Sequence, residues 1–275
     1  MSLAYPSVIQ HRSRARKVRD TLEGYIRIDL VEERMFPAST IMRYVAVVFP
    51  VLLYYFQTAF LHSSNQFMLM LIGTAVIAGL QDAMTGLTSR LSFAMERGTL
   101  ETYLVEPVPW ALIPVAMNIW RSFTGAVLAC VMVAMGCALG GDIRPEGIPV
   151  ALLALFLGIV ACNALGSFAA SFILLFKRGE PVVALYSLAA GVLGGALFPI
   201  DVLPPWIRWI SYLVPHSYVI SAMRDVLLPN PPGGGLPLGW ALAILAGFCA
   251  VSFVLGLFVF DRALRLARRL GILSI

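Results

Sequence analysis

The chain has 275 residues and a formal net charge of +5, and its composition is 59% hydrophobic but only 13% charged. Soluble domains carry about 25% charged residues, so this composition excludes an ordinary soluble enzyme and predicts an integral membrane protein. The polar regions are too short for a separate catalytic domain. The positive charge needs no nucleic acid as a partner, because anionic membrane lipids attract basic residues in the same way.

Residues 1–40 form a polar and basic segment that precedes the first apolar stretch. Within it, residues 14–36 predict an amphipathic helix, because Val18, Leu22, Ile26 and Leu30 recur every four residues among Arg and Glu. Such a helix can lie along the cytoplasmic membrane surface. A soluble helix that packs on a partner has the same pattern, and we favour the interfacial helix.

Six apolar segments follow in residues 41–275, which we interpret as one membrane domain. A spanning helix needs about 20 apolar residues, because the hydrocarbon core is about 30 Å thick and each residue rises about 1.5 Å. Lipid offers the backbone no hydrogen-bond partner, so the segments must be helical. We therefore expect an all-α fold with six spans at residues 41–61, 67–87, 122–139, 148–176, 182–200 and 238–260.

The basic residues give the expected orientation. With the N-terminus in the cytoplasm, all of the 20 Lys and Arg residues except Arg144, Arg208 and Arg224 fall on the cytoplasmic side. This distribution follows the positive-inside rule. We therefore expect both termini to face the cytoplasm.

The longest predicted cytoplasmic loop, residues 90–110, has the pattern of a short helix. Leu100, Tyr103 and Leu104 share one face by their spacing, and Glu96 and Glu101 add charge beside it. An apolar ridge with flanking charges can insert into a cleft on another protein. A solvated loop helix has the same composition, so the residues alone leave both interpretations open.

Residues 198–228, before the last apolar segment, are too apolar for a free loop. Prolines and charges interrupt them every few residues, and their aromatic residues are of the kinds that favour the membrane boundary. We predict two short helices that enter the outer leaflet without crossing it. A seventh span is the alternative, against which Asp201 and Arg208 argue.

Asp82 is the main ionisable residue inside a predicted span, and such residues are costly in lipid. Arg121 opens the next span on the same side, so we predict a structural Asp82–Arg121 pair. Gly191 and Gly195 form a GxxxG pattern that is typical of close helix packing. The chain contains neither a GxxxxGK[ST] phosphate loop nor an HExxH motif, and we predict no catalytic residue and no metal site.

Two of these regions resemble a known family. The run Glu96-Arg97-Gly98-Thr99-Leu100-Glu101, followed by Pro107, resembles the E-x-G-T-L-E…P segment of membrane subunits of bacterial ATP-binding-cassette (ABC) exporters. The branch is that of the type-2 permeases. The run from Phe198 to Arg224 is similar to the region before the last span in this family. The resemblance extends over the whole chain in length, number of spans and placement of both motifs.

This resemblance implies a transport subunit without an enzymatic site of its own. Two permease copies, expected as a homodimer, would form the path in the bacterial cytoplasmic (inner) membrane. Two separate cytoplasmic ATPase subunits would bind ATP and Mg, so no cofactor is expected in this chain. The residues implied to couple to the ATPase are Glu96, Arg97, Gly98, Thr99, Leu100, Glu101 and Tyr103. Those implied to line the path are Phe49, Tyr54, Tyr55, Phe56 and Phe198, although aromatic residues in spans more often face lipid or pack.

The resemblance favours the drug and lipid branch, and hence an amphipathic, lipid-like or drug-like substrate. A lipid-linked glycan is the alternative cargo. Two other functions compete with the exporter: a secondary carrier driven by an ion gradient, and a membrane scaffold that transports nothing. A proton-driven carrier usually needs carboxylates near the middle of the membrane, and the predicted spans have none there.

Overall fold

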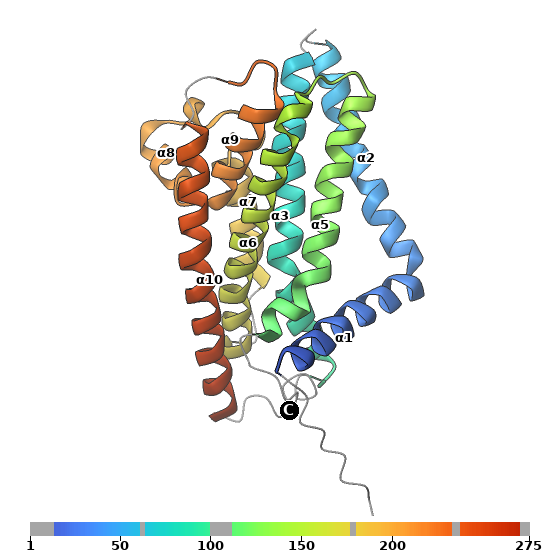
Figure 1. The fold of residues 1–275 in the computed structure, drawn as a ribbon, viewed down its shortest axis with the longest axis vertical. Helices are drawn as coiled ribbons and strands as arrows, with labels where there is room; N and C mark the ends of the chain where they lie inside the picture. The colour runs from blue at the N-terminus through green and yellow to red at the C-terminus, as the bar shows by residue number, and fades with distance from the viewer. Residues whose placement is uncertain (1–13, 61–63, 100–111, 177–179, 233–236, 270–275) are drawn as a thin grey trace, which may run out of the picture.

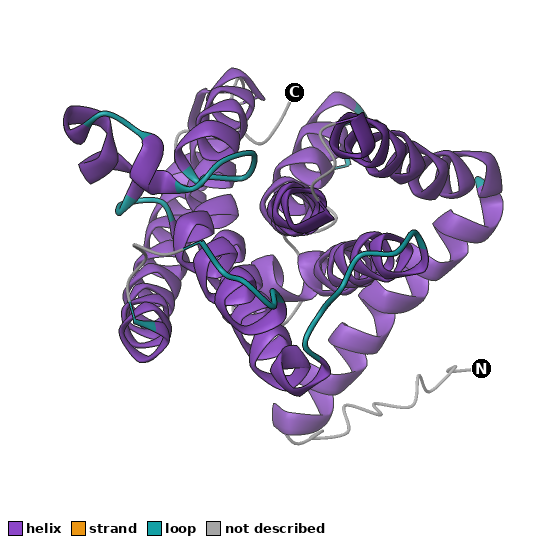
Figure 2. Cartoon of the chain, turned by 90° about the horizontal axis from the view of Figure 1, so that it is seen from above, coloured by secondary structure: helices purple, strands orange, loops and turns teal. Residues whose placement is uncertain are grey.

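The computed structural model describes residues 14–60, 64–99, 112–176, 180–232 and 237–269. Within these ranges the chain forms helices joined by turns, with no strand, which confirms the predicted all-α fold (Figures 1 and 2). The helices are α1 (Arg14–Met35), α2 (Pro37–Phe60), α3 (Ser64–Glu96), α5 (Leu112–Ala138), α6 (Ile148–Phe176), α7 (Glu180–Leu193), α8 (Pro205–Ser211), α9 (Pro215–Leu227) and α10 (Leu238–Arg269). Short 3-10 turns occur at Pro145–Gly147 and Ile200–Val202.

Among the described residues, five helices are long and apolar enough to cross a membrane: α2, α3, α5, α6 and α10. They match five of the six predicted spans. The chain is therefore a multi-pass membrane protein. The remaining predicted span, residues 182–200, is where the structure differs from the prediction.

Helix α7 ends at Leu193 after 14 residues. At about 1.5 Å per residue it is about 21 Å long, less than the hydrocarbon thickness of about 30 Å. Gly195, with φ 73°, ends it. The N–H groups of Gly195 and Ala196 bond back to the carbonyls of Val192 (3.2 Å) and Gly191 (3.4 Å), which is the Schellman arrangement of a helix C-terminus. The predicted GxxxG packing is not made within this copy, since Gly195 stops the helix and no described residue lies within 4 Å of a Cβ on Gly191.

Helices α6 and α10 run in the same direction. The thiol of Cys249 in α10 donates to the carbonyl of Leu157 in α6 (2.8 Å). Seven residues further along both helices, Gly256 of α10 lies against the backbone of Ala164 of α6. Because the contacts advance together, the helices are parallel. The chain between them must return to the end where α6 begins, through α7 and residues 194–204 (Figure 1).

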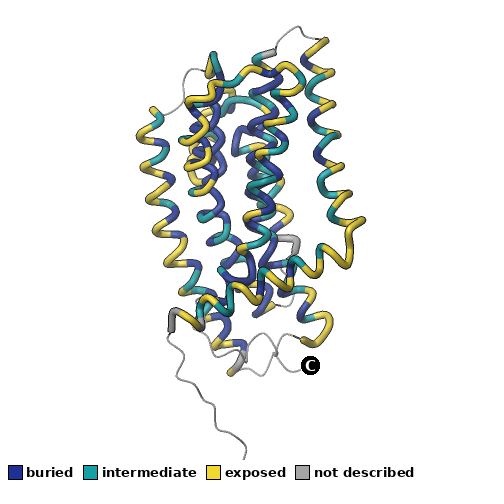
Figure 3. The backbone as a smooth tube through the Cα atoms, turned by 45° about the vertical axis from the view of Figure 1, so that its right-hand side comes forward, coloured by how far each residue is buried: buried dark blue, intermediate teal, exposed yellow. Residues whose placement is uncertain are grey.

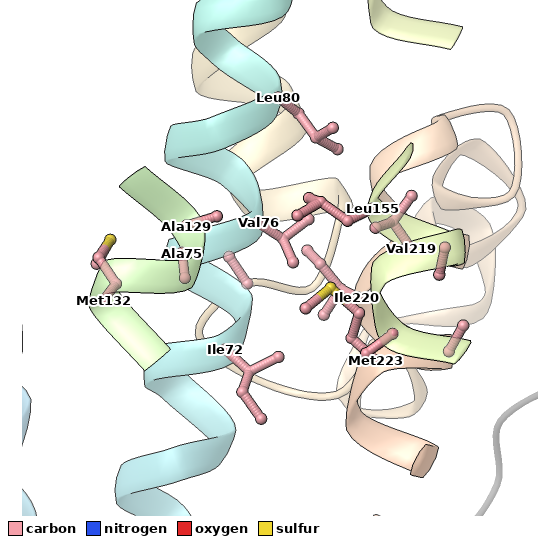
Figure 4. Close-up of a cluster of buried hydrophobic side chains, with 14 of the residues drawn as sticks. Ile72, Ala75, Val76, Leu80, Ala129, Met132, Leu155, Val219, Ile220 and Met223 are labelled. Carbon is pink, nitrogen blue, oxygen red and sulfur yellow. The ribbon is translucent and has the colours of Figure 1, made fainter. Parts of the chain in front are cut away.

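The core of the bundle lies around α3. Figure 4 shows Ile72, Val76 and Leu80 of α3 facing Leu155 of α6 and Val219 of α9, and all five are buried. In its most apolar window α3 is 61% buried, whereas α2 is only 11% buried. Buried positions accordingly gather in the central helices of Figure 3. Helix α2 therefore stands at the edge of the fold.

Helix α1 crosses the end of the bundle at which α3 finishes (Figure 1). Its buried residues are Tyr25, which packs in a cluster with Leu87 and Leu264, and Asp29. The predicted stripe of Val18, Leu22, Ile26 and Leu30 is half-buried beside them. The predicted helix at 14–36 is confirmed, and one of its faces packs on the bundle. Its position relative to a membrane stays a prediction.

Helices α8 and α9 are separate and short, with 7 and 13 residues. Neither can cross the membrane alone, so residues 205–227 do not form a seventh span. Trp206 and Trp209 of α8 are exposed, whereas most of α9 is buried. The two predicted short helices are present, and their depth in a membrane stays a prediction.

Candidate functional site

The first part of the candidate site is the C-terminus of α3, where the E-x-G-T-L-E run begins. Gly98 has φ 65°, a left-handed conformation that costs glycine nothing. Its N–H bonds to the carbonyl of Met95 (3.1 Å), and the N–H of Thr99 bonds to that of Ala94 (2.9 Å). This is again a Schellman C-cap. The glycine of the run therefore has a structural task, which is to end α3 and turn the chain into the following loop.

Four of the seven residues implied in coupling lie at this helix end: Glu96, Arg97, Gly98 and Thr99. All four are exposed, and the guanidinium of Arg97 lies 6.0 Å from the centre of the Phe93 ring. Leu100, Glu101 and Tyr103 lie outside the described residues. The described part of the run thus offers exposed charge of both signs at the tip of α3.

A buried ion pair ties this end of α3 to α1. Arg90 of α3 pairs with Asp29 of α1, and their side chains are 15% and 5% exposed. Leu91 and Ala94 pack in the same cluster as Tyr25. Removing one partner of a buried pair leaves an uncompensated charge, so such contacts hold two elements together firmly. A force on the tip of α3 would therefore also act on α1.

The aromatic residues of α2 fall into two groups. Phe49 and Phe56 are 71% and 66% exposed. Tyr54 and Tyr55 face the bundle: the hydroxyl of Tyr54 accepts a hydrogen bond from Thr74 (3.1 Å), and the Tyr55 ring lies 5.8 Å from that of Phe67. Phe198 is half-buried in the turn after α7. The structure therefore does not bring the five implied path residues together on one surface of this copy.

Phe49 and Phe56 belong to a larger exposed apolar face of α2, which we call the α2 face. Its residues recur at spacings of three and four along the helix, so they line one side. They are Ile41, Met42, Val45, Phe49, Leu52, Leu53, Phe56 and Phe60. This face is suited to contact lipid or another membrane helix.

Asp82 of α3 pairs with Arg43 of α2, and not with Arg121 as predicted. Arg43 also donates to the hydroxyl of Thr124 in α5 (3.1 Å). A Cβ on Gly125 would lie 2.9 Å from the Cβ of Asp82, so this carboxylate faces the contact between α2, α3 and α5. The prediction paired Asp82 with the arginine at the start of the next span along the chain. In the structure α2 packs beside α3, and this places Arg43 against Asp82 instead.

Arg224 of α9 is a structural cation that the sequence reasoning did not assign. It is only 3% exposed, and its guanidinium donates to the carbonyls of Leu69 (2.8 Å), Gly195 (2.7 Å) and Ala196 (2.5 Å). Burial lowers the pKa of Arg224 to about 10, partly offset by neighbouring Asp225, so the group stays charged at neutral pH. The sequence signal for this role is an arginine within an apolar run, because such a residue normally has buried partners.

Taken together, the long apolar helices define a multi-pass membrane protein, with an exposed charged motif at the tip of α3. A comparison with protein families matches residues 33–228 to the ABC-2 type transporter family. Because this match covers more than half of the chain, the chain belongs to the ABC-2 type transporter family and is a permease component. A comparison with curated proteins finds no match.

Proposed function

We propose that the chain is the permease subunit of an ATP-driven exporter in the bacterial cytoplasmic membrane. The observation that carries this proposal is the family match over residues 33–228. The cargo is an amphipathic, lipid-like or drug-like molecule, with a lipid-linked glycan as the alternative. ATP and Mg are bound by separate ATPase subunits, since the sequence has no phosphate loop.

The tip of α3 and the loop after it form the contact with the ATPase. Exposed Glu96 and Arg97 support this assignment, because charged rims set the orientation of a docking partner. The Asp29–Arg90 pair then carries a movement of the tip to α1. ATP-driven closure of two ATPase subunits would thus act on the bundle through α3 and α1 together.

A second copy of the chain covers the α2 face, and the path lies between the two copies. Only 11% of the apolar window of α2 is buried in one copy, which leaves Phe49 and Phe56 free to line the path. The chain crosses the membrane six times, with α7 and residues 194–204 making the fifth crossing in two parts. This number of crossings keeps both termini on the cytoplasmic side.

The secondary-carrier alternative depends on Asp82. Asp82 pairs with Arg43 and lies beside Thr124, which is the environment of a structural ion pair. The scaffold alternative has no specific support among the described residues.

The decisive experiment is purification of the chain from its native membrane in mild detergent. We expect a cassette-type ATPase to co-purify, and we expect Glu96→Lys or Glu101→Lys to release it or to abolish stimulation of its activity. Glu146→Lys is the matched control, because Glu146 is exposed in the turn before α6, at the opposite end of the bundle.

A chain that purifies folded but alone would contradict the exporter. The carrier would then be tested by reconstituting the chain in liposomes, where Asp82→Asn should abolish ion-driven flux. Partner proteins without any flux would instead support the scaffold.

A further inference from the structure

Two arginines and one carboxylate gather where α2, α3 and α5 meet. Arg43 donates to Asp82 and to the hydroxyl of Thr124 (3.1 Å), and Thr124 donates to the backbone carbonyl of Arg121 (3.1 Å). Residues three apart on a helix are neighbours, so the side chains of Arg121 and Thr124 lie on one face of α5. The stem of Arg121 packs on Gly86, which is one turn beyond Asp82 on α3. The stem of Arg121 therefore lies about one helical turn from the Arg43–Asp82 pair.

This group, which we call the arginine cluster, has one positive charge in excess. Asp82 supplies its carboxylate, and Arg43 already occupies it. The side chain of Arg121 is half-buried and makes no hydrogen bond or ion pair with any residue in the described ranges. An arginine in a membrane helix is energetically costly, so it normally pairs with an anionic group or with backbone carbonyls. The structure thus leaves Arg121 without the anion that its position calls for.

The arginine cluster lies near one boundary of the hydrocarbon core. Along α3, Asp82 is about 23 Å and Gly86 about 29 Å from Phe67, at about 1.5 Å per residue. Phe67 begins the apolar part of α3, and the core is about 30 Å thick. Asp82 is therefore about 7 Å inside the core, and Arg121, which packs on Gly86, is at its boundary, next to the lipid phosphates of the leaflet beside α1.

We propose that Arg121, together with Arg43, binds the phosphate group of an amphipathic molecule in this leaflet. The planar guanidinium donates two parallel hydrogen bonds to phosphate oxygens, and one carboxylate leaves the cluster net positive. The rings of Trp120 and Phe123, with centres 5.6 Å apart, follow on the adjacent face of α5 and offer apolar surface for a chain. The ligand class is an acyl-chain phosphate, whether a membrane phospholipid or a phosphate-bearing cargo.

The test measures binding by the purified full chain, without ATPase or transport. Native mass spectrometry counts bound phosphatidylglycerol and phosphatidylcholine at increasing lipid concentration. We expect the anionic lipid to bind preferentially and Arg121→Gln to weaken this binding at least about tenfold. Arg121→Lys should recover part of the loss, because it restores the charge but not the paired donors.

Arg262→Gln is the matched control. Arg262 lies in the C-terminal part of α10, where it contacts the Phe258 ring (4.9 Å), away from the arginine cluster. This variant should bind phosphatidylglycerol like the unchanged chain. Equal binding by Arg121→Gln and the unchanged chain, or an equal loss in Arg262→Gln, would overturn the proposal. Should Arg121→Gln fail to fold, Asp82→Asn decides: removing the carboxylate must tighten binding of the anionic lipid, and unchanged binding refutes the site.

Inorganic phosphate added as a competitor separates the possible sources of the phosphate. Displacement of the lipid at millimolar phosphate would show a site for free phosphate and would overturn the requirement for an acyl chain. The absence of displacement is the expected result. The proposed exporter depends on ATPase co-purification, so either inference can fail while the other stands.

Discussion

Gly73 of α3 lies directly under the guanidinium of Arg224 and against the carbonyl oxygen of Ala196. A Cβ at this position would overlap the backbone of Ala196, and it would also meet the arginine. Arg224 binds the carbonyls of Leu69 and Ala196, so the two contacts are parts of one structure. The missing side chain of Gly73 allows the turn after α7 to approach the centre of the bundle.

We expect Gly73→Ala to destabilise the fold, because the backbone of Ala196 cannot yield as a flexible side chain would. Overpacking of this kind costs typically about 1–3 kcal/mol. Gly247→Ala is the control, since no part of the described structure would be crowded within 4 Å by a Cβ at Gly247 in α10. Thermal unfolding in detergent should show a lower midpoint for Gly73→Ala and an unchanged or slightly higher midpoint for Gly247→Ala. Equal midpoints would contradict the packing described.

Much of the fold could be predicted from hydrophobicity alone. Long apolar runs dictate spanning helices because lipid leaves the backbone no other partner. The four-residue repeat at Val18 and Leu22 likewise indicated α1, and the prolines and aromatic residues of 198–228 indicated two short helices. These features depend on local pattern, which the sequence displays directly.

What could not be predicted depends on which helices become neighbours. Asp82 had two candidate cations, and the choice of Arg43 follows from α2 packing beside α3 and α5. The length of α7 was overestimated for a different reason. Gly195 has the left-handed φ that ends the helix, whereas hydrophobicity continues to Ile200. A glycine pair followed by Pro199 was the local signal that the hydrophobic pattern concealed.

A second prediction concerns the left-handed C-cap of α3 at Gly98. Gly98→Ala must adopt a conformation that costs an L-residue roughly 1–2 kcal/mol, so the end of α3 should fray. Gly98→Asn should lose less, because asparagine tolerates this conformation better. Gly24→Ala, in an exposed helical position with open space, is the control. Hydrogen exchange of the amides at Gly98 and Thr99 should be faster in Gly98→Ala than in the control, and equal rates would refute the cap.

A third prediction concerns the Asp29–Arg90 pair. Asp29→Ala removes the ion pair that joins α1 to α3, and breaking a typical buried pair costs about 3–5 kcal/mol. We expect α1 to detach and to be cut by protease at low enzyme concentration. Glu23→Ala removes the partner of exposed Arg19 instead, a loss of at most about 0.5 kcal/mol. Resistance of α1 to protease in both variants would show that the pair does not hold the helix.

The last prediction tests the α2 face. If a second copy covers this face, Phe49→Cys should form a disulfide between two chains in native membranes, because a symmetric interface can place a residue beside its own copy. Cys130 is exposed, so it is first replaced by Ala to prevent it from forming cross-links of its own. Phe156→Cys is the control, since Phe156 is 60% exposed but lies on α6. Because the position nearest the symmetry axis is not known in advance, Val45→Cys and Phe56→Cys, one and two turns away, complete the scan of the same face. Cross-linking at any of these α2 positions, with none at Phe156→Cys, supports the pair of permeases. Cross-linking at Phe156→Cys alone would place the interface on α6 and leave the α2 face to lipid.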